Sequence, residues 1–196
     1  MLTVSFAAER PEGAYALAIP VRSEDMLHDR LARFDDAARS LAIRAADAQR
    51  FDRETAAVAE AFVEEGDSAR RLVLVGMGGA QADDALYERI GGALTGRLLT
   101  SGETRLVIDL EGLKLGARDA ARIAFGAAAR SWRYDKYRTK LGRKQKPTLT
   151  EVVLVGGPGG AEAEWAHFSA LLGGLDLART LVTEPANIIY PETFID

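Results

Sequence analysis

The stretch RRLVLVGMGG, residues 70–79, decides the fold class of this chain. Its central residues, Leu72 to Val75, are apolar at four successive positions, so both faces of the strand that they predict must be covered. Similar runs occur in TRLVIDL at 104–110 and in LTEVVLVGGPGG at 149–160. Strands that are apolar on both faces are typical of a sheet covered by helices on each side. The pattern therefore predicts an α/β fold.

The remaining segments fit the same layered arrangement. Strands are predicted at 2–7 and 14–21, with ERPEG between them as a turn. One helix is predicted from Asp25 to about Arg50, and others over 83–99 and 117–130. Apolar residues at steps of three and four mark the first of these, at Leu27, Leu31, Phe34, Ala38, Leu41 and Ala45. A last helix carries the stripe Trp165, Phe168, Leu172 and Leu175, although two glycines, Gly173 and Gly174, weaken it.

The segment TAAVAEAFVEE, residues 55–65, is ambiguous. Its alanines and glutamates favour a helix, whereas the alternation around Val58, Glu60 and Phe62 also fits a strand.

Composition excludes several classes of protein. The chain has 196 residues, enough for one domain or one domain plus a linker, and its net charge of −4 suggests neither nucleic acid nor an anionic membrane as a partner. It has no cysteine, which excludes disulfides and thiolate chemistry and fits a reducing compartment. It has no signal-peptide pattern and no run of about 20 apolar residues. We therefore expect a cytoplasmic protein with no membrane partner.

Two glycine-rich junctions are candidate phosphate-binding turns. They contain Gly76, Gly78 and Gly79 after one strand, and Gly156, Gly157, Gly159 and Gly160 after another. Glycine lets backbone N–H groups approach a phosphate at a helix N-terminus. Neither junction completes a nucleotide-binding motif, and neither is followed by a lysine or hydroxyl residue that would hold a phosphate. We favour the alternative that these are tight turns needing φ > 0, and expect ADP-ribose to bind weakly or not at all.

A basic tract, RSWRYDKYRTKLGRKQK at 130–146, has a local net charge of +7, whereas residues 151–196 carry −6. Its candidate surface cations are Arg133, Lys136, Arg138, Lys140, Arg143, Lys144 and Lys146. Basic residues interleaved with aromatic ones can bind nucleic acid. We favour a solvated surface that pairs with the acidic residues, with Trp132 or Tyr134 turned inward.

Catalytic and metal-binding motifs are missing from the sequence. His28 and His167 are isolated, and there is neither a His-Glu-x-x-His motif nor a carboxylate cluster typical of a metal site. The Gly-x-Ser-x-Gly motif of a serine hydrolase is also missing. The sequence therefore predicts neither a catalytic nor a metal-binding residue in this chain.

Three segments, taken in order, resemble the N-terminal domain of the leucyl (cytosol) aminopeptidase family. They are RLVLVGMGG at 71–79, FGAAARSWRYDKYRTK at 125–140 and LARTLVTEPANIIYPETF at 177–194. The last is the most specific, because the family has a helix ending Ala-Arg-Asp-Leu-Val-Asn-x-Pro-Ala-Asn. Thr180 departs from this pattern, where the family usually has aspartate.

The resemblance implies a central mixed sheet flanked by helices, similar to a macro domain, and it favours a strand at 55–65. It further implies a non-catalytic domain over 1–176, with 177–196 a linker helix and the start of a missing catalytic domain. That second domain would bind two divalent metals, zinc or manganese, and the full-length protein would form a homo-hexamer. This chain alone is then expected to bind no cofactor and to be inactive. The competing hypotheses are a nucleotide or ADP-ribose module and a nucleic-acid module.

Overall fold

The computed structural model describes residues 2–66, 68–79 and 84–188, and its centre is a six-stranded sheet in the order β1-β6-β5-β2-β4-β3. Its strands are β1 Thr3–Ala7, β2 Ala16–Val21, β3 Val58–Glu65, β4 Ser68–Gly76, β5 Arg105–Asp109 and β6 Glu151–Val155. Five strands run parallel, and β3 alone is antiparallel, paired with β4 from Val58 opposite Val75 to Glu65 opposite Ser68. The predicted α/β fold with a mixed sheet is confirmed.

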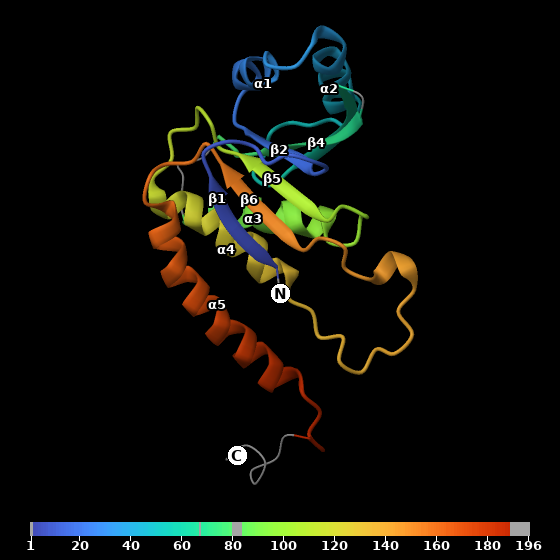
Figure 1. The fold of residues 1–196 in the computed structure, drawn as a ribbon, viewed down its shortest axis with the longest axis vertical. Coiled ribbons are helices and arrows are strands. Elements are labelled where there is room, and N and C mark those ends of the chain that lie inside the picture. The colour runs from blue at the N-terminus through green and yellow to red at the C-terminus, as the bar shows by residue number, and fades with distance from the viewer. Residues whose placement is uncertain (1, 67, 80–83, 189–196) are drawn as a thin grey trace.

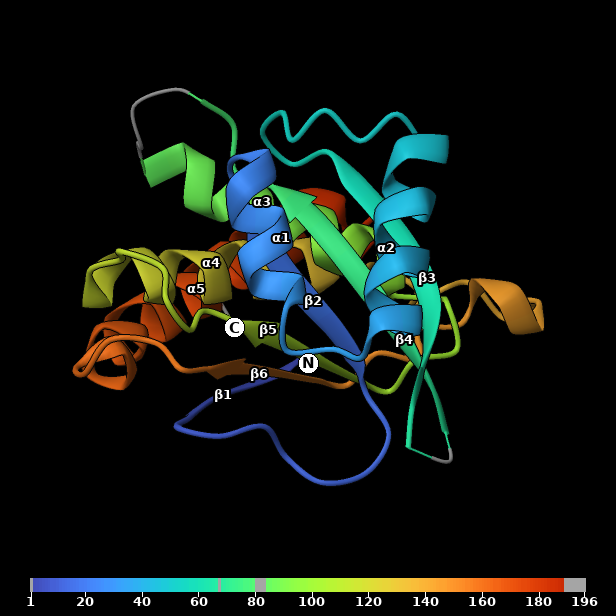
Figure 2. The ribbon, with the colours of Figure 1, turned by 90° about the horizontal axis from the view of Figure 1, so that it is seen from above.

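Helices cover both faces of the sheet (Figures 1 and 2). The helices are α1 Glu24–Leu31, α2 Asp36–Ala48, α3 Asp84–Leu98, α4 Ala117–Ser131 and α5 Ala161–Thr183. One apolar core joins α3 and α4 to the sheet, and a second core joins α1 and α2 to its opposite face. Helix α5 packs mainly on α4, so it forms an outer layer. Strand β2 lies between the two cores and all six of its residues are buried.

Helices α3 and α4 pack closely because glycines face one another's backbone. A Cβ atom placed on Gly91 would collide with the carbonyl oxygen of Ile123, and one on Gly126 with the carbonyl oxygen of Glu88. Side chains larger than hydrogen at these positions would push the helices apart.

The predicted helix from Asp25 to Arg50 is wrong, because the segment forms two helices. Helix α1 ends at Leu31, and Asp35 then caps α2 by accepting a hydrogen bond from the backbone N–H of Ala38 at 2.7 Å. An aspartate at the N-cap accepts a hydrogen bond from a backbone N–H of the first helical turn that otherwise has no partner. It therefore favours the start of a second helix at this point over the continuation of the first. The buried face of α2 is Ala38, Ala42 and Ala46, and Leu41 is exposed.

The strand order decides two further predictions, one for the connection between β1 and β2 and one for residues 55–65. The interpretation of ERPEG as a turn is wrong, because β1 and β2 lie in the same direction with β6 and β5 between them. Parallel strands cannot be joined by a tight turn, so residues 8–15 form a longer connection. The strand expected at 55–65 is confirmed as β3.

The outer edge of β3 is covered at its centre by a side chain. The amide of Gln49 donates from Nε2 to the carbonyl oxygen of Glu60 at 2.8 Å and accepts from the Glu60 N–H at 3.1 Å. Gln49 is the C-cap residue of α2, so the helix end and the strand edge are joined by these two bonds.

The predicted boundary at residue 176 falls within α5, which is continuous to Thr183, and residues 189–196 lie outside the described part.

Candidate functional site

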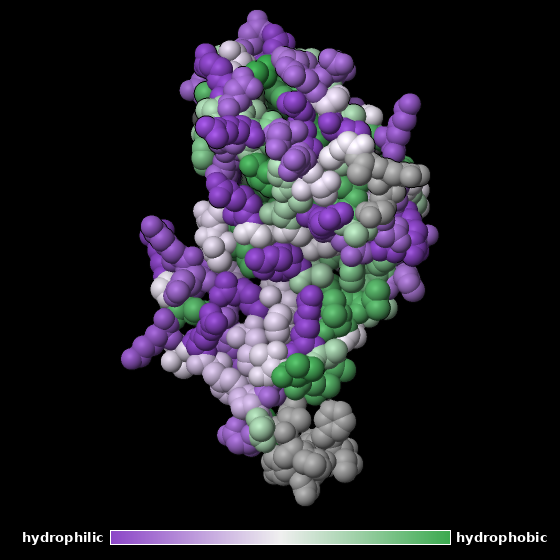
Figure 3. Space-filling view, turned by 180° about the vertical axis from the view of Figure 1, so that it is seen from behind, coloured by the Kyte–Doolittle hydropathy of each residue, from purple (hydrophilic) through white to green (hydrophobic). Residues whose placement is uncertain are grey.

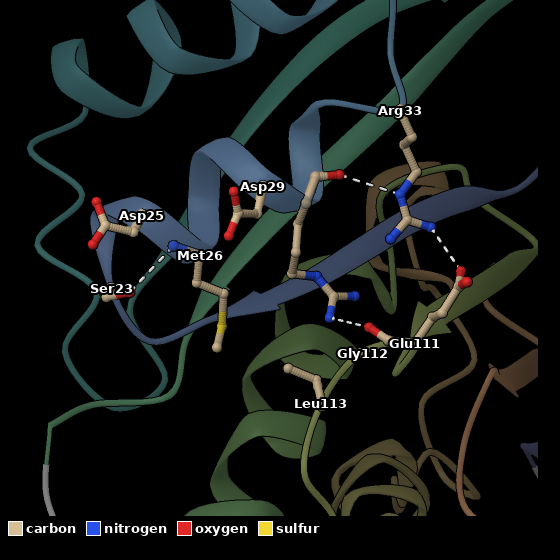
Figure 4. A pocket seen from close by; sticks show the side chains of 9 residues that line it. Ser23, Asp25, Met26, Asp29, Arg33, Glu111, Gly112 and Leu113 are labelled. Atoms are coloured by element: carbon tan, nitrogen blue, oxygen red, sulfur yellow. Dashed lines mark hydrogen bonds and ion pairs between the residues drawn. The ribbon is translucent and has the colours of Figure 1, made fainter.

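A crevice opens where the chain leaves β2 and β5 on opposite faces of the sheet. After β2 it enters α1 on one face, and after β5 it enters α4 on the other. In α/β sheets, ligands bind at such switch points, beyond the carboxyl ends of the strands. The cavity there is about 510 Å³ and opens between α1 and the loop after β5 (Figure 4). Its lining residues are Ser23, Asp25, Met26, Asp29, Arg30, Arg33, Glu111, Gly112 and Leu113.

Behind this crevice, the carboxylate of Asp109 gathers three arginines. Asp109, the last residue of β5, is 1% exposed. It accepts hydrogen bonds from Arg33 Nη1 at 2.7 Å, Arg10 Nη2 at 2.8 Å and Arg30 Nη2 at 3.2 Å. The backbone N–H of Glu111 donates to the same carboxylate at 3.0 Å. The cluster therefore ties the loop after β1 and the end of α1 to the end of β5.

Arg30 is the most buried of the three arginines, with 6% of its side chain exposed. Burial lowers the pKa of its guanidinium, against the nearby charge of Asp109, which raises it. Its Nη1 donates to the carbonyl oxygen of Glu111 at 2.7 Å, and its Nη2 donates to the carbonyl oxygen of Asp109 at 2.5 Å. Its Nε is buried and has no hydrogen-bond partner within the described part of the chain. A buried donor left in this state costs about 1–3 kcal/mol.

The wall of the crevice carries charges of both signs. Arg33 donates from Nη1 to Glu111 Oε2 at 3.2 Å and from Nε to the carbonyl oxygen of Arg30 at 3.2 Å. Asp25 and Asp29 are exposed on α1, one turn apart, and Met26 beside them supplies apolar surface. In Figure 4, Asp25 and Asp29 lie along α1 and Arg33 lies just beyond its end, while Gly112 and Leu113 belong to the loop after β5. Such a wall can bind a small molecule that carries both charges.

In the first glycine junction, most of the backbone N–H groups already donate hydrogen bonds to other parts of the protein backbone. Gly78 has φ +65°, and its N–H donates to the carbonyl oxygen of Arg53 at 2.9 Å. The Gly76 N–H donates to Ala57 at 2.8 Å, and a Cβ there would collide with the backbone of residues 53–54. Gly79 has open space around the position of a Cβ. Two of the three N–H groups are therefore unavailable to a phosphate.

At the second junction, Gly156 has φ +64° and donates its N–H to Ala7 at 3.2 Å. Gly160 has φ +86° and is the N-cap of α5. Gly157 and Gly159 line a shallow cavity of about 260 Å³ with Glu162, whose carboxylate opposes an anion. The left-handed conformation explains the glycines at 156 and 160, while the phosphate-binding interpretation stays a prediction for the others.

Most of the basic tract lies on the surface in the loop between α4 and β6. Lys136, Arg138, Lys140, Arg143, Lys144 and Lys146 are exposed, and Arg133 is half-buried with an ion pair to Asp135 at 2.6 Å. The short 3-10 helix Arg143–Gln145 lies within this loop. Trp132 and Tyr134 are half-buried, and Arg179 of α5 lies over the Trp132 ring, 5.6 Å from its centroid.

The described tract reaches one acidic residue of the C-terminal region, Glu184, just after α5. Lys136 Nζ contacts Glu184 Oε1 at 2.6 Å, and the Tyr137 hydroxyl donates to Oε2 at 2.8 Å. The Lys136 ammonium, with the phenols of Tyr134 and Tyr137, lowers the pKa of Glu184 to about 2. Nearby, Arg179 donates to the carbonyl oxygen of Ala129 at 2.9 Å. These contacts fix the end of α5 against the loop that follows α4.

The structure does not bring the two histidines together. His28 is exposed on α1, and His167 is exposed on α5 with its ring 5.6 Å from that of Phe168. Within residues 2–66, 68–79 and 84–188 there is no group of three or more His, Cys, Asp or Glu side chains that could hold a metal ion. The helices in the same ranges include none that is both long and apolar enough to cross a membrane.

The fold and the crevice define an α/β domain with a mixed sheet and a potential binding site at the carboxyl ends of its parallel strands. Residues 18–141 match the sequence model of the N-terminal domain of the cytosol aminopeptidase family. This chain therefore belongs to the cytosol aminopeptidase family, in which it corresponds to the N-terminal domain.

Curated relatives extend the match over most of the chain. A probable cytosol aminopeptidase of Methylorubrum populi is 35% identical over 156 residues, which are 79% of this chain and 31% of the relative. The probable cytosol aminopeptidase of Caulobacter vibrioides is 38% identical over 133 residues, 66% of this chain and 26% of the relative. The chain thus spans about a third of the length of the curated relatives it matches.

Solved structures share the fold. A variant of tomato leucine aminopeptidase superposes with a TM-score of 0.79 at 20% identity, covering 99% of this chain and 40% of that one. The bottromycin maturation enzyme BotP, solved in complex with manganese, superposes with a TM-score of 0.67 at 21% identity. That match covers 93% of this chain and 34% of BotP.

Sequence reasoning missed the crevice and its charged residues. Arg10, Arg30 and Arg33 are spread over the loop after β1 and the end of α1, and Asp109 lies more than 70 residues further along the chain. One signal was present: the apolar run at 104–110 is broken by an aspartate at the end of the strand, followed by a second acid at Glu111. A charged side chain at the carboxyl end of a buried strand requires an ion-pair or hydrogen-bond partner.

Proposed function

We propose that this chain is the non-catalytic N-terminal domain of a metal-dependent leucyl aminopeptidase, which releases N-terminal residues from peptides. The observation that carries the proposal is the match of residues 18–141 to this domain, in relatives that extend well beyond it. Two divalent ions, zinc or manganese, would be bound by the catalytic domain of the longer protein. There they would activate a water molecule and polarise the scissile carbonyl group.

The outer face of α5 supports a role in domain assembly. Large apolar side chains on this helix are exposed at Leu171, Leu177 and Val182, the last to 87%. Figure 3 shows hydrophobic surface gathered along this side of the molecule. Contiguous apolar surface of this kind marks an interaction site. We propose that the catalytic domain covers it, with residues 177–196 as the connection, and that the cytoplasmic full-length protein assembles as a hexamer.

The test compares this 196-residue chain with the full product of its gene. Both proteins are assayed for leucine p-nitroanilide hydrolysis with added Mn²⁺ or Zn²⁺. We expect hydrolysis by the full product and none by the chain alone. A gene product that ends at residue 196, or turnover that follows the short chain through repeated purification, would contradict the proposal.

A light-scattering measurement tests the assembly. The full product should have the mass of a hexamer, and the short chain that of a monomer or weak dimer. A stable hexamer of the short chain would show that the apolar face of α5 is an interface between copies of this domain. The nucleotide and nucleic-acid alternatives gain no support from the comparisons, and the glycine N–H groups bound within the protein argue against the first.

A further inference from the structure

The crevice beside α1 holds charged atoms of both signs that lack partners within the described residues. Arg33 uses Nε and Nη1 for its hydrogen bonds, which leaves Nη2 without a described acceptor. Arg30 lines the same cavity, but its Nε is closed off from solvent and its Nη1 and Nη2 donate within the protein, so it contributes positive charge rather than a free donor. On α1, the same helix that carries Arg30, the carboxylates of Asp25 and Asp29 form no ion pair or hydrogen bond with the described chain.

The lining also includes apolar side chains. Met26 is on the α1 face that Arg30 continues one turn later, and Leu113 comes from the loop after β5. The crevice therefore presents the Arg33 guanidinium, carboxylates and an apolar surface together. Its volume of about 510 Å³ falls within the range of small-molecule sites.

We propose that this crevice binds a small zwitterion, a free amino acid or short peptide with an apolar side chain. The ligand carboxylate would face the Nη2 of Arg33, and its ammonium group would face Asp25 and Asp29. The apolar side chain would contact Met26 and Leu113. Binding at this site needs no catalysis, so it can be measured on the chain alone, whether or not the proposed function holds.

The same lining argues against a phosphate ligand. Asp25, Asp29 and Glu111 place three carboxylates around the opening, and Asp109 already takes hydrogen bonds from three arginines. A phosphate would meet more repulsion than attraction there, because each nearby carboxylate opposes its charge. A zwitterion instead satisfies groups of both signs.

The experiment is titration calorimetry of this chain with four ligands that differ by one group each. Leucine and leucyl-glycine carry both charges, N-acetylleucine lacks the ammonium group, and leucinamide lacks the carboxylate. We expect leucine or leucyl-glycine to bind, and the one that binds more tightly distinguishes an amino-acid site from a peptide site. Loss of either charge should weaken binding at least about tenfold, because a charged group of the pocket is left unpaired.

Two matched pairs of variants place the site. Asp29→Asn removes an exposed carboxylate at the crevice, and Asp47→Asn removes one on the neighbouring helix α2. Arg33→Gln removes a guanidinium of the crevice, and Arg39→Gln removes one that pairs on the surface with Asp36. We expect at least about fivefold weaker leucine binding in the first variant of each pair and no change in the second.

Asp29→Asn keeps the test valid even where Arg33→Gln unfolds the chain, since the Asp29 side chain is exposed and forms no hydrogen bond or ion pair with the described residues. Absence of heat from both leucine and leucyl-glycine at up to about 10 mM, a range that detects millimolar affinity, would overturn the proposal. So would equal binding of leucine and leucinamide, or an Asp29→Asn variant that binds like the original chain.

Discussion

Two carboxylates hold distant parts of this molecule together, and their surroundings differ. Asp109 lies at the end of β5 inside the fold and accepts hydrogen bonds from three arginines. Glu184 lies at the end of α5 and is held by Lys136 and Tyr137. Its side chain is only 6% exposed, yet the side chains that cover it are themselves half exposed, at 56% for Lys136. Water therefore reaches the side chains that pair with Glu184, but it does not reach Arg30, which pairs with Asp109.

The difference shows that the number of contacts does not determine what a carboxylate contributes. An exposed partner that loses its carboxylate is solvated by water at little cost. A buried guanidinium that loses its carboxylate stays charged in a medium that cannot solvate it. Asp109 should therefore matter for the stability of the whole fold, and Glu184 for the position of the end of α5.

The substitution Asp109→Asn should have the largest effect. It keeps the size of the side chain but leaves Arg30 without its counter-ion, so we expect unfolding free energy to fall by about 3–5 kcal/mol. Urea unfolding followed by circular dichroism measures this. The matched control is Glu111→Gln, at a side chain that is 72% exposed and whose one ion pair among the described residues is with Arg33; a loss below about 1 kcal/mol is expected. Equal losses in the two variants would refute the distinction between buried and exposed charge.

The substitution Arg30→Met should have a smaller effect than Asp109→Asn. Asp109 keeps Arg10 and Arg33, and methionine fills much of the same volume. The cost comes from the carbonyl oxygens of Asp109 and Glu111, which lose their donor, and we expect about 1–3 kcal/mol. The same urea experiment measures it. A loss larger than that of Asp109→Asn would mean that the arginine, rather than the carboxylate, organises the cluster.

Acid should weaken the contacts of Glu184 only well below the ordinary carboxyl range. The folded pKa of about 2 lies below the ordinary value of 4.5, so the contacts of Glu184 are stabilising above pH 4.5. They are lost as the pH falls from 4.5 through about 2. A carbon-13 titration of the Glu184 carboxyl group checks the pKa. Glu184→Gln should speed exchange of the amide at residue 184, which donates to the carbonyl oxygen of Thr180, while the unfolding midpoint changes little. If the carbon-13 titration of the Glu184 carboxyl group instead has its midpoint near pH 4.5, Lys136 does not hold this carboxylate in solution.

Added salt should have the smallest effect of all, and it should change amide exchange at Glu184 but not next to Asp109. Raising ionic strength from about 0.1 M to 1 M shortens the screening length from about 10 Å to 3 Å. Exchange of the Glu184 amide should then accelerate, whereas the Glu111 amide, which donates to Asp109, should keep its protection. Hydrogen exchange followed by NMR reports both amides in one sample. Equal acceleration at the two amides would show that solvent ions reach Asp109 as well.

The parts of the fold that depend on local pattern could be predicted from the sequence. The apolar runs at 72–75 and 152–155 form buried strands, and the alanine-rich segment forms α4. The break at Asp35 was missed because the apolar spacing continues through it, and only the capping hydrogen bond reveals the new helix. Strand β3 required the family resemblance, since its alanines and glutamates also favour a helix.

The candidate site could not be predicted in the same way. Arg30 and Asp109 are 79 residues apart, and they meet because β2 and β5 become neighbours in the sheet. No periodicity in either segment encodes that neighbourhood. The aspartate at the end of an apolar strand indicated only that some partner was needed, and the topology supplied three arginines.

The two hydrogen bonds from Gln49 to Glu60 have a consequence for how this domain behaves in a crowded cell. An open strand edge is a template on which another chain can add a strand, the first step toward aggregation. The Gln49 amide imitates one residue of such a strand, because it donates and accepts at the spacing of a peptide group. The end of helix α2 thus acts as a molecular plug at this edge, and an intruding strand would have to displace it before it could pair with β3 at Glu60.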